Sequence, residues 1–343
     1  VVPNHSFLPI RGRIENIQVE SEALSNNLVG DPSSRTVAIY LPENYETSGD
    51  EYPLFLCLAG FTGSGLGQIG WKAFQETLPQ RIERLIFEGK MGPGIFAFPD
   101  CFTSLGGNQY INSSALGNWS DFLCDDLIPN LEANYRLKKN RKNRAVFGKS
   151  SGGYGALIQG MTRADIWSGI ACHSGDMAFD LCYLADFPGL LRNLSVYDGN
   201  IRAFVEKVRK NKKVLGNDFH NLMILAMAAS YDPDRDAPFG IRLPVSPDTC
   251  ELIQERWDNW LAWDPVMMVE TDSGQTNLAQ MAGLFFDCGT KDQYNLLYGA
   301  RRLKKKLDSL EISHRYEEFP DTHSSIDYRL DESLPFLYKA ISK

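Results

Sequence analysis

The segment AVFGKSSGGYGA, residues 145–156, contains two overlapping patterns that imply different chemistry. The tripeptide Gly148-Lys149-Ser150 is the end of a P-loop, in which the lysine would bind phosphate and the serine would bind magnesium. The pentapeptide Gly148–Gly152 also reads G-x-S-x-G, in which Ser150 would be a nucleophile. The two interpretations predict a nucleotide-binding protein and a serine-dependent enzyme, respectively.

Spacing and composition exclude the P-loop. That motif requires a glycine five residues before Gly148, where the chain has Asn143. The next four residues, RAVF, are typical of a strand and leave no room for a phosphate-binding loop. A strand, a turn rich in small residues and then a helix is the context of a nucleophile elbow. We therefore expect Ser150 to be the nucleophile.

A serine hydroxyl needs a base to remove its proton, and the chain has five histidines. They are His5, His173, His220, His314 and His323. Elbow enzymes place the triad in the chain order serine, acid, histidine, and the base comes from a loop after the last strand. His5 precedes the elbow, His173 and His220 follow it too closely, and His314 lies within the expected last strand. His323, in EFPDTHSSID, is therefore the expected base.

The acid should follow the strand before the last one. The segment LFFDCGTKDQYN offers Asp287 within the expected strand and Asp292 on the loop after it. A loop carboxylate can turn toward the imidazole and stabilise its charged form, so we expect Asp292 to be the acid. Asp287, Asp264 and Asp321 are alternatives.

Acyl transfer also requires hydrogen-bond donors for the oxyanion. One expected donor is the N–H of Ser151, directly after the nucleophile. The second should come from the glycine-rich loop AGFTGSGLG, residues 59–67, with the N–H of Phe61 as first choice and that of Thr62 as second.

The loop GGNQYINSS, residues 106–114, offers polar and aromatic side chains near the same strand ends. We expect Gln109 and Tyr110 to form a polar floor of the substrate pocket, which would favour esters with small or polar groups. The alternative is a surface loop whose side chains satisfy their own turn. Trp257, Trp260 and Trp263 have helical spacing and are expected to form a local core rather than a substrate platform.

The candidate residues lie in a regular alternation of apolar segments of strand length with segments of helix length. Expected strands are 36–42, 53–60, 94–100, 144–148, 168–175, 283–289 and 314–320. Expected helices are 71–88, 119–134, 154–164, 294–310 and 333–341. The first strand alternates with period two, as a half-exposed edge strand would, and the continuous apolar ones suit parallel strands covered on both faces. The pattern predicts an α/β fold whose candidate residues gather at the carboxyl ends of the strands.

Residues 177–263 interrupt this alternation with helices and a loop rich in proline and aspartate. We expect one domain over residues 1–343, with 177–263 as a helical, cap-like insertion over the strand ends. A separately folded domain is the alternative, although no flexible linker flanks the segment.

Composition limits the possible partners and location. The 343 residues carry a net charge of -8 and no long basic run, which argues against nucleic-acid binding. No apolar run approaches the roughly 20 residues of a membrane span, and no signal peptide is visible, although the chain begins at Val1. Seven scattered cysteines without a C-x-x-C pair suggest reduced thiols and favour a cytoplasmic protein. We expect no metal site.

The residues from about Gly12 to Ile341 resemble the putative esterase family of α/β-hydrolases, which includes esterase D, enterochelin-esterase-like enzymes and the antigen 85 mycolyltransferases. The matching pieces, in the shared order, are VAIYLPENY, YPLFLCLAGFTGSG, FAFPD, GGNQYINSSALGNWSDFLCDDLIPNLEANYR, AVFGKSSGGYGAL, HSGD, DCGTKDQYN and YEEFPDTHS. The resemblance implies an α/β-hydrolase fold, a Ser150–Asp292–His323 triad and no cofactor. Many relatives have His-Gly where this chain has Ala59-Gly60, so the packing at that point should differ.

The expected activity is that of a serine carboxylesterase acting on a small-molecule ester through an acyl-enzyme on Ser150. An acyltransferase would use the same triad with an acceptor alcohol in place of water. A non-catalytic binding module should have lost a triad residue, and none is lost. A peptidase is compatible with the fold, but no feature of the sequence indicates one.

Overall fold

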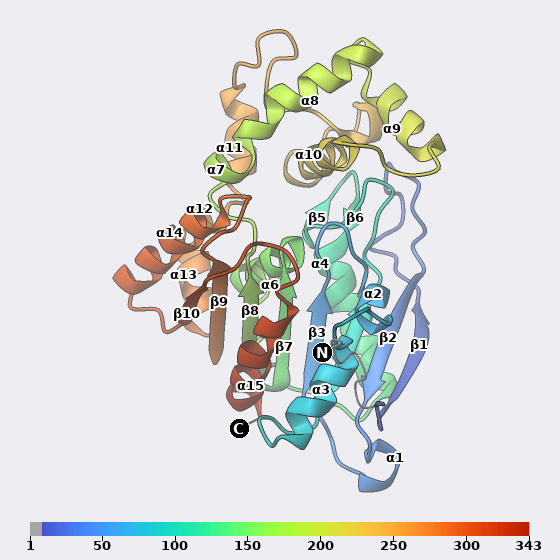
Figure 1. The fold of residues 1–343 in the computed structure, drawn as a ribbon, viewed down its shortest axis with the longest axis vertical. Helices are drawn as coiled ribbons and strands as arrows, with labels where there is room; N and C mark the ends of the chain where they lie inside the picture. Colours follow the sequence, from blue (N-terminus) through green and yellow to red (C-terminus); the bar gives the residue numbers. More distant parts are fainter. Residues whose placement is uncertain (1–8, 343) are drawn as a thin grey trace, which may run out of the picture.

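A computed structural model describes residues 9–342, which form an eight-stranded sheet with helices on both faces (Figure 1). The strands are β1 (Arg13–Val19), β2 (Arg35–Leu41), β3 (Leu54–Leu58), β4 (Ile95–Pro99), β7 (Arg144–Lys149), β8 (Gly169–His173), β9 (Gly283–Gly289) and β10 (Arg315–Phe319). Their order in the sheet is β1-β2-β4-β3-β7-β8-β9-β10. Only β2 is antiparallel to its neighbours, β1 and β4, and the remaining pairs are parallel. The predicted α/β fold with a mostly parallel sheet is confirmed.

The helices between and beyond these strands vary in length. The chain up to β8 contains α1 (Tyr45–Ser48), α2 (Gly65–Ile69), α3 (Leu78–Phe87), α4 (Trp119–Asp121), the π-helix η1 (Phe122–Leu127), α5 (Ile128–Asn134), η2 (Arg141–Asn143) and α6 (Ser151–Thr162). After β8 come α7 (Phe179–Cys182), η3 (Leu184–Asp186), α8 (Phe187–Leu194), η4 (Ser195–Tyr197), α9 (Ile201–Lys210), α10 (Asp218–Tyr231), η5 (Pro238–Gly240), α11 (Gln254–Leu261), α12 (Pro265–Met268) and α13 (Asp272–Ala279). The C-terminal helices are α14 (Leu296–Ser309), η6 (Asp327–Arg329) and α15 (Leu330–Ile341), and β5 (Asn112–Ser113) pairs with β6 (Gly117–Asn118) in a separate hairpin.

The central strands are apolar throughout because both faces of the sheet are covered. In β7, Val146 belongs to the core cluster under α6, whereas Ala145 and Phe147 belong to the cluster under α3 and α15. Successive side chains of a strand point to opposite faces, so each face receives its own set of apolar residues. This explains why an unbroken apolar run marks a buried parallel strand in this chain.

The prediction that the first strand lies at the edge of the sheet was wrong. Residues 36–42 were expected to form a half-exposed edge strand, but β2 lies inside the sheet between β1 and β4 and is almost entirely buried. The edge position belongs to β1, whose polar, partly exposed side chains gave no strong strand signal. The alternation in β2 therefore does not reflect exposure of one face.

The remaining expected elements occur close to their predicted positions, except for the start of one helix. α3 begins at Leu78 rather than near Trp71, because Thr77 caps it: its side chain accepts from Gln80 N, and the Gln80 side chain accepts from Thr77 N. This reciprocal capping box satisfies two backbone donors at the first turn and ends the preceding loop.

The segment 177–263 contains helices but no strand, and Figure 1 shows helices α8 to α11 above the carboxyl ends of the sheet strands. Trp257 and Trp260 are buried there and pack on Phe187. This agrees with a local aromatic core rather than a substrate platform. Among helices in the described range 9–342, none is long and apolar enough to cross a bilayer.

Candidate active site

Ser150 stands at a sharp turn between β7 and α6. Its backbone has φ 57° and ψ -129°, which is strained for a residue other than glycine. The backbone N–H of Ser150 donates to His173 O at 2.9 Å, and Tyr154 N donates to Ser150 O at 2.8 Å. These bonds fix the turn so that the side chain stands at the carboxyl end of β7, as in a nucleophile elbow.

The glycines on either side of Ser150 are required by close backbone packing. A Cβ on Gly152 would lie 2.0 Å from Leu58 O, and one on Gly148 would lie 2.5 Å from the same atom. Both contacts are with backbone of β3, which cannot rotate away as a side chain can. The small residues of the motif therefore allow α6 and β3 to approach each other directly beneath Ser150.

His323 lies on the loop after β10, and Asp292 lies on the loop after β9. His323 Nδ1 is 2.8 Å from Asp292 Oδ2, and the Asp292 side chain is completely buried. Asp292 Oδ1 accepts from Tyr294 N at 2.9 Å, and Gln293 Oε1 accepts from His323 N at 3.0 Å. These bonds hold both loops together and orient the imidazole.

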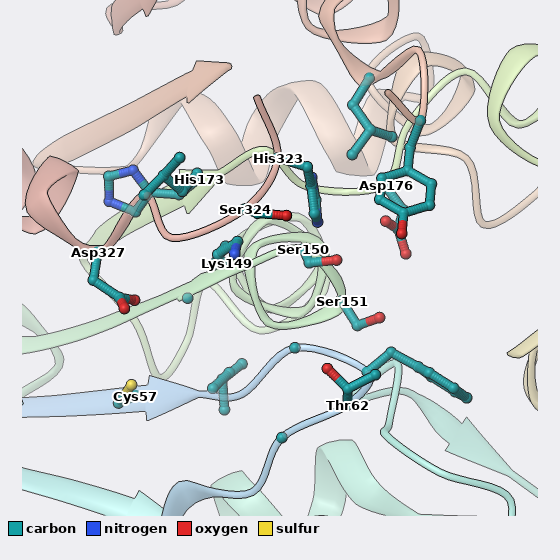
Figure 2. A pocket seen from close by; sticks show the side chains of 18 of the residues that line it. Cys57, Thr62, Lys149, Ser150, Ser151, His173, Asp176, His323, Ser324 and Asp327 are labelled. Carbon is teal, nitrogen blue, oxygen red and sulfur yellow. The ribbon is translucent and has the colours of Figure 1, made fainter. Parts of the chain in front are cut away.

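The other ring nitrogen of His323 is available for chemistry. No described residue hydrogen-bonds Nε2, including Ser150, but His323 and Ser150 line the same cavity. Figure 2 shows the imidazole extending toward Ser150. In unliganded enzymes the bond between nucleophile and base is often long and closes only when substrate binds.

The alternative acids have other partners. Asp287 lies 2.8 Å from His173 Nδ1 and also accepts from Arg329 Nε at 2.8 Å, so it belongs to a separate buried network. Asp264 accepts from the backbone N–H groups of Ala178, Phe179 and Val266. Asp321 is partly exposed and accepts from Tyr328 Oη. Within residues 9–342, none of the three contacts His323 by a hydrogen bond. His5 lies outside the described residues.

The expected oxyanion donors line the cavity with Ser150. Phe61, Thr62 and Ser151 all contribute to its wall. The loop lies against the elbow, since a Cβ on Gly60 would be 3.4 Å from Ser150 Cβ. In the described part of the chain, the N–H groups of Phe61 and Ser151 have no hydrogen-bond acceptor. Two unused donors beside a nucleophile are what a developing oxyanion requires.

This cavity has a volume of about 420 Å³ and receives residues from both the sheet and the helical segment above it. Cys182, Tyr183, Phe219 and Met223 come from that segment. The volume is in the range of small-molecule sites. The cavity can therefore hold a small ester with its carbonyl beside Ser150.

Gln109 and Tyr110 do not form the polar floor of the substrate pocket that the sequence predicted. Gln109 and Tyr110 are each about 2% exposed and do not line the cavity. Tyr110 Oη donates to Ala59 O at 2.5 Å, and its ring packs against Gly155 of α6. Gln109 Nε2 donates to Ser151 Oγ at 3.2 Å. Both side chains therefore lie behind the cavity wall. Because α6 packs directly against Tyr110 and Gln109 bonds Ser151 at the start of that helix, no room is left for substrate beside either side chain.

Asp176 is a cavity residue that sequence reasoning missed. It follows β8 by three residues, is about 9% exposed, and accepts from Tyr183 Oη at 3.0 Å through Oδ2. Burial raises the pKa of its carboxyl, while the hydrogen bond from Tyr183 and the charge of His323 act in the opposite direction. The available signal was its place in HSGD, at the end of a predicted parallel strand.

Lys149, the residue before the nucleophile, also lines the cavity. Figure 2 shows Lys149 on the side of Ser150 where Asp327 and Cys57 lie, away from Asp176. Burial lowers the pKa of its amine, whereas the nearby Asp327 acts to raise it. Asp327 is itself paired with Lys72 at 3.4 Å.

Sequence relatives and solved structures agree with this architecture. Two esterases of Mycobacterium tuberculosis strains, Esterase MT1326 and Esterase Rv1288, are each 33% identical over 146 residues. The alignment covers 40% of this chain but only 28% of the length of each relative.

The structural likeness extends over nearly the whole chain at low sequence identity, so it establishes the fold alone. A ferulic acid esterase has a TM-score of 0.62 and 17% identity, with 97% of this chain and 100% of that chain covered. An S-formylglutathione hydrolase from Agrobacterium tumefaciens has a TM-score of 0.58 and 14% identity, with 97% of each chain covered. A family model described as putative esterase matches residues 32–331. The chain therefore belongs to the putative esterase family and has the α/β-hydrolase fold.

Proposed function

We propose that this protein is a serine carboxylesterase that hydrolyses small-molecule esters through an acyl-enzyme on Ser150. One observation carries the proposal: the strained Ser150 shares a cavity with His323, whose Nδ1 is held 2.8 Å from the buried Asp292 carboxylate. Membership of the putative esterase family supports the same chemistry.

In the proposed acylation step, Ser150 Oγ attacks the ester carbonyl carbon while His323 Nε2 takes its proton. Asp292 stabilises the imidazolium that results. The carbonyl oxygen becomes an oxyanion, for which the N–H groups of Phe61 and Ser151 are the proposed donors, with Thr62 as an alternative to Phe61. The C–O bond to the alcohol then breaks, and the alcohol leaves with the proton from His323.

Deacylation repeats these steps with water. His323 removes a proton from water, the hydroxide attacks the acyl carbon, and the second oxyanion uses the same two donors. Collapse releases the carboxylic acid and returns the proton to Ser150 Oγ. The helical segment 177–263 is proposed to act as a cap that narrows access to the cavity, since four of its residues line it.

A fluorophosphonate probe followed by peptide mass spectrometry tests the nucleophile. We expect a single adduct on Ser150, and Ser150→Ala should lose the adduct and about 10³-fold or more of kcat on p-nitrophenyl esters. Ser324→Ala is the matched control, because Ser324 also lines the cavity and should keep both. An adduct on another serine, or an active Ser150→Ala variant, would contradict the proposal. Product analysis with added alcohol then separates hydrolysis from acyl transfer.

A further inference from the structure

We propose that Asp176 selects esters that carry a hydrogen-bond donor, either a hydroxyl or an ammonium group, at its end of the cavity. This inference rests on the proposed esterase function, because it concerns which esters reach Ser150. It makes Asp176 a specificity-determining residue with no role in bond cleavage.

The position of Asp176 suits contact with substrate. It lies in the cavity wall with Ser150 and Ser151. Figure 2 shows Asp176 and Lys149 on opposite sides of Ser150. A substrate whose carbonyl lies at Ser150 can therefore extend toward Asp176 without approaching the lysine.

One oxygen of the Asp176 carboxyl is unused. Oδ2 accepts from Tyr183 Oη at 3.0 Å and from Gln109 Nε2 at 3.3 Å. No residue in the described range donates to Oδ1, and none forms an ion pair with the carboxylate. Because the residue lines the cavity, this acceptor is available to a bound molecule.

The other buried aspartates of the described chain show what a purely structural carboxylate looks like. Asp264 accepts three backbone N–H groups, Asp287 contacts both His173 and Arg329, and Asp232 is paired with Arg242. A buried charge is normally paired or fully hydrogen-bonded in this way, because leaving water is costly. Asp176 has only neutral donors, both on one oxygen, so the fold itself does not explain its presence.

The other residues of the cavity wall suit a small substrate group that carries a hydrogen-bond donor. Tyr183, Phe219 and Tyr294 present aromatic surface in the same cavity. An aromatic wall packs against an alkyl chain and also attracts a cation. On the other side of Ser150, the cavity wall carries two lysines, Lys149 and Lys72, and one carboxylate, Asp327, which pairs with Lys72. The excess positive charge on that side favours placement of an ammonium group toward Asp176.

The test compares p-nitrophenyl hexanoate with its ω-hydroxy and ω-ammonio derivatives, and butyl butyrate with the same substituents on the alcohol side. In one of the two series, the wild-type protein should favour donor-bearing esters over the neutral ester by roughly tenfold or more in kcat/KM, the size of a hydrogen bond to a charged group. Asp176→Leu should remove that preference. Asp176→Asn, which keeps an acceptor but loses the charge, should reduce the preference for ammonium more than the preference for hydroxyl.

Controls separate the possible failures. Asp248→Asn removes the same charge from an exposed loop outside this cavity and should change the ratios by less than about twofold. Equal ratios in the wild type and Asp176→Leu in both series would overturn the inference, as would an Asp176→Asn variant that cannot fold. Hydrolysis without any donor preference contradicts this inference alone. Absence of hydrolysis and of Ser150 labelling in the wild type contradicts the proposed function as well.

Discussion

The Asp287 carboxylate lies 2.8 Å from His173 Nδ1, the same separation that joins Asp292 to His323. The two pairs differ at the other ring nitrogen. His173 Nε2 is 2.8 Å from Ser333 Oγ of α15, whereas no described residue binds His323 Nε2. A general base needs a free nitrogen that faces the reacting group, so the His173 pair fits a structural role and the His323 pair fits catalysis.

Asp292→Asn should lower kcat by about 10³- to 10⁴-fold, because the amide can no longer stabilise the imidazolium or hold its tautomer. Steady-state kinetics on a p-nitrophenyl ester measures the change. Asp321→Asn is the matched control, since Asp321 lies two residues from His323 but contacts Tyr328 instead, and its kcat should fall by less than about threefold. The reverse pattern would assign the acid to Asp321.

Gly152→Ala should destabilise the protein by about 1–3 kcal/mol and reduce kcat, because the new Cβ would press against Leu58 O and displace either β3 or the elbow. Gly67→Ala provides the comparison. Gly67 lies in α2 with no atom within 4 Å of the new Cβ, and alanine should raise the free energy of unfolding by roughly 0.5–1 kcal/mol. Urea unfolding measures both. A Gly152→Ala variant with wild-type stability would show that the close packing at the elbow is not required.

Tyr110→Phe should lower kcat while leaving KM nearly unchanged. The hydroxyl that it removes donates to the backbone O of Ala59, the first residue of the loop that carries the proposed oxyanion donor Phe61. Leaving this buried carbonyl without a donor should also cost about 1–3 kcal/mol of stability. Tyr298→Phe, on an exposed side chain, should change neither quantity. A rise in KM with unchanged kcat would instead indicate that Tyr110 contacts substrate.

The sequence predicted those parts of the site that depend on local order along the chain. Ser150 follows from a strand, a glycine-rich turn and a helix, and His323 follows from its position after the last strand. The role of Tyr110 could not be predicted, because its burial depends on Gly155 and on Ala59 O, which are distant in sequence. Asp176 was missed for a related reason: among the described residues, what distinguishes it is that its carboxylate has no cationic partner and no donor to Oδ1, which only the folded chain reveals.

Asp176→Asn should stabilise the protein at neutral pH and lose that advantage in acid. Burial raises the pKa of Asp176 in the folded protein above the ordinary value of about 3.9 that it has in the unfolded chain. At pH values between the unfolded-state pKa and the folded-state pKa, the folded state therefore binds more protons than the unfolded state. The free energy of unfolding contributed by this carboxyl therefore falls as pH rises through that window, and its charge is a full penalty above the raised pKa. Asparagine carries no such penalty, so the variant should have a higher free energy of unfolding than the wild type at neutral pH. Thermal unfolding of both proteins from about pH 4 to pH 8 should show the two curves of stability against pH converging at the acid end.

Asp248→Asn is the control. Its curve of stability against pH should stay parallel to that of the wild type over the same range, because that carboxylate is exposed. If Asp176→Asn is less stable than the wild type at every pH, the carboxylate stabilises the fold and was not retained at a cost to stability for binding.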